Sequence, residues 1–181
     1  PEGKGFPVLE LLYNNSDDRR RLAEAAQQMW LKNLGIQIKL LSQEWKVFLE
    51  SRAQGRYDIC RGDWVGDYLD ANAFLEIYAS NNLQNDTGWK NYAFDDLIKR
   101  AASTQDKPLR LSYLEQAEAI AIKESPVIPL YFPAYTALVQ PSVRGWYPNL
   151  QAIIGWPYLY LEDKMQSEAA ELATQPIETG L

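Results

Sequence analysis

The 181-residue sequence contains no histidine and only one cysteine. Without histidine it lacks the usual general base, the partner of the common serine and cysteine nucleophiles, and the commonest metal ligand. The single Cys60 excludes an intrachain disulfide, and its apolar neighbours predict a buried small side chain rather than a reactive thiol. We therefore expect no catalytic residues, no metal and no cofactor.

Clustered basic residues and long apolar runs are also missing. The net charge is −6, and phosphate binding needs clustered Lys and Arg, so we expect no nucleic-acid partner. The run Arg19-Arg20-Arg21 follows two acids at a predicted helix start, which favours a solvated helix face. No segment approaches the roughly 20 apolar residues of a membrane span.

The N-terminal half alternates between strand-like and helix-like patterns. An apolar run over residues 6–13 precedes a helical spacing of apolar residues that ends at Gly35. Alternation from Ile36 to Leu40, helical spacing over 45–52 and an extended run over 57–61 follow. The order βαβαβ predicts an α/β fold with parallel strands in one sheet and helices on its faces.

The C-terminal half has fewer strong patterns. We expect one short helix near 73–79 within an irregular stretch, then helices over 94–103 and 109–123. Residues 127–132 and 135–139 are predicted to be strands around Pro133, and 158–161 a further strand. The polar stretch 163–181 is expected to be a loose helix or disordered.

A candidate binding segment follows the third predicted strand. Ligands of open parallel sheets bind outside the carboxyl ends of the strands, and residues 61–68 have the sequence RGDWVGDY. The segment combines a cation, carboxylates, aromatic rings and glycines that let a backbone approach a ligand. From these residues alone, a helix-capping or loop-bracing role for Asp67 is favoured over a ligand contact.

Several separate motifs occur along the sequence in the same order as in a known family. From about Val8 to Glu162 it resembles the bacterial oligopeptide-binding proteins of extracellular solute-binding family 5. The motifs are Leu12-Tyr13-Asn14, Leu34-Gly35-Ile36, Gln43-Glu44-Trp45, Tyr57-Asp58-Ile59, Arg61-Gly62-Asp63-Trp64, Gly66-Asp67-Tyr68, Phe74-Leu75, Thr87-Gly88-Trp89, Phe94-Asp95 and Ile128-Pro129-Leu130-Tyr131.

The resemblance implies a two-lobed receptor, periplasmic or lipid-anchored, that closes on an oligopeptide and delivers it to the permease of an ABC importer. It also implies that this chain matches only the C-terminal third of such a receptor, whose fold is a type II (cluster C) periplasmic binding protein. Residues 1–134 would form an incomplete second lobe, 135–162 a returning segment that packs on the absent N-terminal lobe, and 163–181 a polar tail. Membrane contact would come only through a lipid anchor or the permease.

The resemblance further implies roles for individual residues. Asp67 would receive the peptide α-amino group, and the backbone around Gly62 would run beside the peptide as an added strand. Arg61 would face the cleft, where a ligand contact and a purely structural pairing with Asp63 or Asp67 are equally favoured. The remaining candidate ligand-binding residues are Trp64, Trp45 and Arg52.

Other functions fit the sequence less well. The same receptor fold could bind a dipeptide or an oligosaccharide. A glycosidase would use Asp63 and Asp67 as its paired carboxylates, but no catalytic signature flanks them. Asp67, Asp70 and Asn72 only faintly suggest a calcium loop, because the alternating acids and glycine of an EF-hand are missing. An isolated interaction domain would explain the aromatic content without any small ligand.

Overall fold

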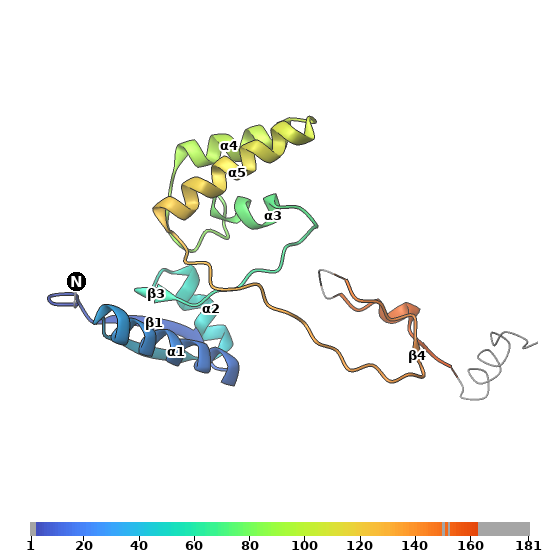
Figure 1. The fold of residues 1–181 in the computed structure, drawn as a ribbon, viewed down its shortest axis with the longest axis horizontal. Coiled ribbons are helices and arrows are strands. Elements are labelled where there is room, and N and C mark those ends of the chain that lie inside the picture. Colours follow the sequence, from blue (N-terminus) through green and yellow to red (C-terminus); the bar gives the residue numbers. More distant parts are fainter. Residues whose placement is uncertain (1–2, 150, 152, 163–181) are drawn as a thin grey trace, which may run out of the picture. The chain divides into compact units, whose positions relative to one another are not determined.

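A computed structural model describes residues 3–149, 151 and 153–162 of the chain. The chain forms two compact units, Pro1–Ile128 and Pro129–Leu181. Figure 1 traces the elements in chain order along the colour bar. The predicted C-terminal tail, residues 163–181, lies outside the described residues.

A three-stranded parallel sheet opens the first unit (Figure 1). The central strand β1 (Leu9–Asn14) pairs with β2 (Ile38–Gln43) on one side and with β3 (Ile59–Cys60) on the other. This confirms the predicted α/β fold with a parallel sheet. The first two strands begin later than predicted, and β3 keeps ladder pairing at only two of the expected positions.

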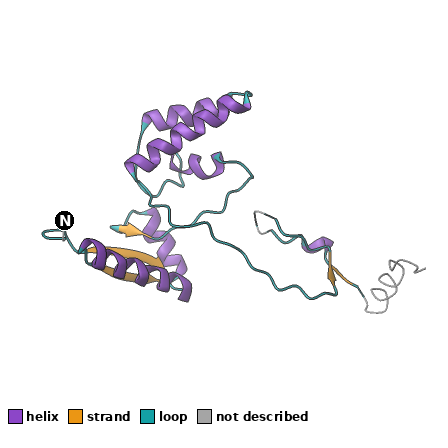
Figure 2. Ribbon diagram, in the orientation of Figure 1, coloured by secondary structure: helices purple, strands orange, loops and turns teal. Residues whose placement is uncertain are grey.

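Two helices connect these strands, and Figure 2 shows both beside the sheet. In α1 (Asp17–Leu34), the Ser16 side chain caps the first turn. Gly35 ends the helix at φ 67°, as predicted. The buried residues Leu11, Tyr13, Ala23 and Ile38 form the core between α1 and the sheet. Because side chains alternate along a strand, Leu12 points to the opposite face. The second helix, α2 (Trp45–Ala53), contacts β1 and buries Phe48 to 1% exposure.

A helical hairpin completes the first unit (Figure 1). It follows a short helical segment, α3 (Asn72–Leu75) and the 3₁₀ turn η1 (Glu76–Tyr78). The hairpin helices are α4 (Tyr92–Ser103) and α5 (Lys107–Glu124), capped at their N-termini by Asn91 and Asp106. Their core consists of Phe94, Ile98, Ala101, Leu114, Ala117 and Ala121. All three predicted helical regions are confirmed, and this core is separate from the one under α1.

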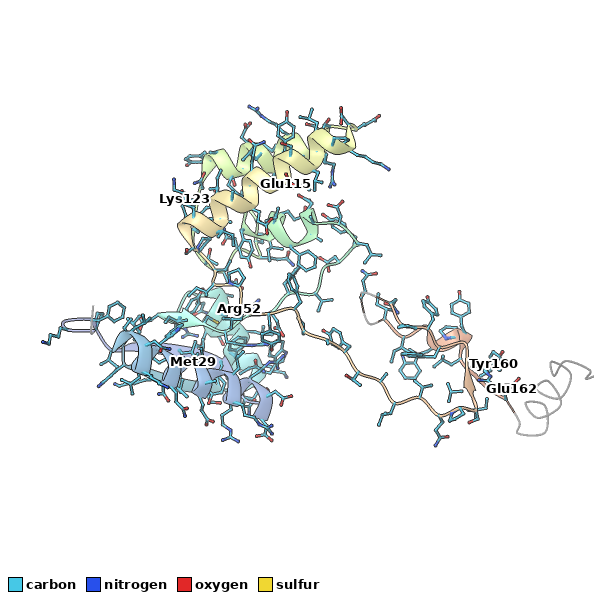
Figure 3. The ribbon with its side chains drawn as sticks, in the orientation of Figure 1. Met29, Arg52, Glu115, Lys123, Tyr160 and Glu162 are labelled. Carbon is cyan, nitrogen blue, oxygen red and sulfur yellow. The ribbon has the colours of Figure 1, made fainter. Side chains whose placement is uncertain are left out.

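The second unit contains little regular structure among its described residues. An antiparallel pair, β4 (Val143–Arg144) and β5 (Tyr160–Leu161), encloses the 3₁₀ turn η2 (Trp156–Tyr158). The ion pair between Arg144 Nε and Glu162 Oε2, 2.5 Å apart, lies next to this pairing. Figure 3 labels Tyr160 and Glu162 in this unit.

The predicted strands at 127–132 and 135–139 are wrong. Both segments lack regular secondary structure, and no described strand pairs with either of them. A β-strand depends on hydrogen bonds from a neighbouring strand, so an apolar sequence cannot form a ladder by itself. Phe132 and Leu138 are accordingly almost fully exposed. Within the described residues, no helix is both long and apolar enough to cross a membrane.

Candidate functional site

The segment after β3 continues directly from the sheet. The backbone N–H of Arg61 donates to the carbonyl of Leu12 at 2.8 Å, which extends the β1–β3 ladder by one bond. Arg61, Gly62, Trp64 and Asp67 therefore lie on one loop that leaves the carboxyl end of the sheet. Because these four residues are predicted to bind the ligand, we call residues 61–71 the ligand loop.

Arg61 and Asp63 form an ion pair at the start of the ligand loop. Arg61 Nη1 lies 3.1 Å from Asp63 Oδ2, and the Arg61 side chain is only 13% exposed. The same oxygen lies 3.3 Å from Nη2 of Arg19, on the first turn of α1. The structural pairing that the sequence left open for Arg61 is therefore present, and two guanidinium groups share one carboxylate.

Arg19 is a residue of this site that sequence reasoning missed. The interpretation of residues 19–21 as a solvated face holds for Arg20, which pairs with Asp17 and Glu24 on the helix surface. Arg19 instead reaches the ligand loop. The position of the first turn of α1, just after the carboxyl end of β1, was the signal that could have indicated this contact.

Polar atoms also line the carboxyl ends of β1 and β2. Asn14 and Gln43 are paired in register, and the buried oxygens Oδ1 of Asn14 and Oε1 of Gln43 have no hydrogen-bond partner in the described part of the chain. Nearby, an open hollow of about 320 Å³ is lined by Tyr13, Asn15, Ser16, Asp17, Arg20 and Ser42. Buried acceptors normally have hydrogen-bond donors. These two oxygens can therefore accept further hydrogen bonds at this edge of the sheet.

The ligand loop is held by side-chain hydrogen bonds. Trp64 Nε1 donates to the carbonyl of Ala73 at 2.8 Å, which fixes the half-buried indole against α3. Gly66 is buried, and a Cβ at that position would lie 2.9 Å from the ring of Phe74. By contrast, nothing lies within 4 Å of a Cβ built on Gly62, so a side chain at that position would meet open space. Asp67 is exposed on this loop.

Asp70 at the end of the loop is engaged by Arg110 on α5. The guanidinium makes two hydrogen bonds, Nη1 to Oδ2 at 2.7 Å and Nη2 to Oδ1 at 2.8 Å. These bonds hold the pKa of the Asp70 carboxyl below its usual range. The carboxylate that a calcium loop would need is thus bound to a guanidinium. No group of three or more candidate metal ligands occurs in the described ranges.

The other two predicted site residues lie on α2 rather than on the ligand loop. The Trp45 ring stacks on Phe48 with centroids 5.7 Å apart, and 45% of Trp45 is exposed. Arg52, labelled in Figure 3, has its guanidinium 5.9 Å from the Phe48 centroid, and its Nε lies 2.6 Å from Asp86 Oδ2. The ring of Phe48 thus contacts both predicted site residues of this helix, Trp45 and Arg52.

Cys60 lies at the end of β3 and is half-buried, not fully buried as predicted. Burial raises the pKa of its thiol to about 11, although the nearby Arg52 guanidinium lowers it. A thiol with this pKa is protonated at neutral pH, in agreement with the predicted unreactive side chain.

We expect Cys60 to react roughly tenfold more slowly with iodoacetamide at pH 8 in the native chain than in urea. Raising the pKa from 9.0 to about 11 lowers the thiolate fraction about 100-fold. The thiolate of a thiol with a higher pKa is also a stronger nucleophile, and this raises the rate by roughly tenfold. The net reduction in rate is therefore about tenfold. Because the folded pKa is raised, the native rate should climb with pH up to about 11, while the rate in urea levels off near 9. Mass spectrometry of quenched samples measures both rates, and equal rates would contradict the raised pKa.

Comparison with known proteins shows which families and structures the chain is similar to. Residues 1–86 match the family model described as bacterial extracellular solute-binding proteins, family 5 Middle. Over about the first half of its length, the chain is similar to this family. The chain is 38% identical over 139 residues to the periplasmic oligopeptide-binding protein OppA of Escherichia coli K12, covering 77% of this chain and 26% of that protein. It is 37% identical over 140 residues to the dipeptide-binding protein DppE of Bacillus subtilis 168, with the same coverage.

Solved structures of peptide-binding proteins share the fold. The Haemophilus influenzae OppA complex with RPPGFSPFR matches with a TM-score of 0.82 and 31% identity, covering 87% of this chain and 32% of that one. Escherichia coli MppA, a murein tripeptide binding protein, matches with a TM-score of 0.78 and 34% identity over 86% of this chain. The chain spans about a quarter of the length of the curated relatives it matches.

Proposed function

We propose that this chain is part of an extracytoplasmic substrate-binding component of an ABC importer that captures oligopeptides between two lobes. The observation that carries the proposal is the 38% identity to an oligopeptide-binding protein over 139 residues. The fold match to a solved complex with the peptide RPPGFSPFR agrees with it. The relatives are named as periplasmic, which supports a periplasmic or lipid-anchored location.

The proposed capture uses the ligand loop. Asp67 supplies a carboxylate for the peptide α-amino group, because an ammonium removed from water needs an opposite charge nearby. The backbone around Gly62, where a Cβ would meet open space, runs beside the peptide and pairs with it as an added strand. The loop carries no bond-breaking machinery in this proposal, and the protein acts by binding alone.

The remaining predicted residues have supporting roles. Arg61, held by Asp63, keeps positive charge beside the peptide and contacts its acidic groups. Trp64 and Trp45 provide aromatic walls for peptide side chains, and Arg52 borders the same region from α2. Lobe closure over the peptide then couples binding to recognition by the permease.

The domain division follows from the same proposal. Residues 1–134 form part of the second lobe, 135–162 return to the N-terminal lobe, and 163–181 form the tail. The N-terminal lobe supplies the opposite wall of the cleft. The exposed apolar residue Leu138 fits a returning segment that packs on another part of the protein.

The test offers the complete protein a mixture of peptides and oligosaccharides, followed by mass spectrometry of what is retained. We expect peptides of several residues to be retained, whereas this 181-residue chain alone should retain none, because it lacks the opposite wall. Selective retention of dipeptides would support the dipeptide alternative that DppE represents. Retention of oligosaccharides without peptides, or their cleavage, would overturn the proposal.

A further inference from the structure

The pair between Arg110 and Asp70 connects two segments that are 40 residues apart. Arg110 lies on the first turn of α5, and Asp70 lies near the end of the ligand loop. The two N–H donors and two carboxylate oxygens meet at 2.7 and 2.8 Å, the parallel arrangement that gives arginine–carboxylate pairs their directionality. Such a pair fixes orientation as well as distance.

The surroundings favour a persistent contact. The side chains of Arg110 and Asp70 are 30% and 29% exposed. Asp70 Oδ1 also accepts from the backbone N–H of Asn72 at 2.8 Å, which joins the pair to the start of α3. The ion pair of Asp96 and Arg100 is different, because both side chains are more than half exposed and both lie on α4.

The pair restrains the ligand loop at one end while the sheet restrains the other. At its start, Arg61 N–H bonds to Leu12 in the ladder. At its end, three residues after Asp67, Asp70 is held by Arg110. A loop fixed at both ends has little conformational entropy left to lose, so a ligand does not bear the cost of ordering it.

We propose that Arg110 is a positioning residue for ligand binding: through Asp70 it holds the ligand loop in the conformation that presents Asp67 to the peptide amino group. This inference rests on the proposed function. It assigns a role in binding to a residue of the α4–α5 hairpin that is itself not expected to touch the ligand.

The test compares Arg110→Met and wild type in the complete protein. We expect peptide affinity by calorimetry to fall about three- to tenfold, because the ligand must now order the loop. Amide hydrogen exchange, measured without ligand, should accelerate in residues 62–71 and remain unchanged in α1 and β1. Arg110→Lys keeps the charge but not the paired geometry, so it should recover part of the affinity. The matched control Arg100→Met breaks the exposed pair on α4 and should leave affinity and loop exchange at the wild-type level.

The outcomes separate the two proposals. If wild type binds peptide and Arg110→Met binds it equally well, the positioning role is overturned and the proposed function stands. If exchange accelerates throughout the first unit and affinity falls only with global stability, Arg110 is merely structural and the inference is overturned. If wild type binds no peptide, the proposed function is overturned and the inference falls with it.

Discussion

Asp67→Ala in the complete protein is expected to weaken binding of a peptide with a free amino terminus by more than tenfold. The substitution would leave the peptide ammonium in the closed cleft without its counter-charge. A desolvated, unpaired ion costs several kcal/mol, although partial hydration and movement of the peptide recover some of this. A tenfold loss corresponds to about 1.4 kcal/mol, well within that cost.

Isothermal titration calorimetry measures this loss, and N-acetylated peptide provides a matched comparison. Wild type should bind the acetylated peptide weakly, and Asp67→Ala should not weaken it further, because the group that Asp67 binds is already gone. Asp96→Ala removes an exposed carboxylate on α4 and should not change the affinity for either peptide. Equal affinity of Asp67→Ala and wild type for the free peptide would reject the anchor role.

Phe94→Ala is expected to lower the free energy of unfolding by about 3–5 kcal/mol, the range for removing a buried aromatic ring. Phe94 is fully buried in the α4–α5 core. Its ring also meets Trp89 edge to face, with centroids 5.0 Å apart. The substitution therefore removes both buried area and an aromatic contact from the hairpin that carries Arg110.

Urea unfolding followed by far-ultraviolet circular dichroism measures the effect on the 181-residue chain. Leu83→Ala is the control, because Leu83 is 99% exposed and its truncation should change the free energy of unfolding by no more than about 0.5 kcal/mol. Similar losses for the two variants would show that the hairpin core does not contribute the expected stability.

The elements that the sequence predicted well depend on local signals. The Ser16 cap, the Gly35 terminus and the helical spacing between them define α1 without reference to any other segment. The wrong strands at 127–139 depended on a partner that local alternation cannot supply. The residue pattern shows only that a segment is apolar. Whether the segment forms a strand depends on hydrogen bonds to a neighbouring strand.

The candidate site divides in the same way. The ligand loop could be located because it follows β3, and the family resemblance gave Asp67 its predicted role. Arg19 and Arg110 escaped notice because their partners lie 44 and 40 residues away, and no periodic pattern connects them. Both missed residues act by holding the loop, which is a property of the tertiary structure.

The Arg110–Asp70 pair has a consequence for protein engineering. Residues 1–86, which match the family model, include the whole ligand loop but exclude α5. A chimera that transplants only this segment between relatives would therefore receive Asp70 from one parent and its partner position from the other. Specificity grafts that use this protein should carry Asp70 and Arg110 together, because the ligand loop and its support are encoded in separate stretches of the gene.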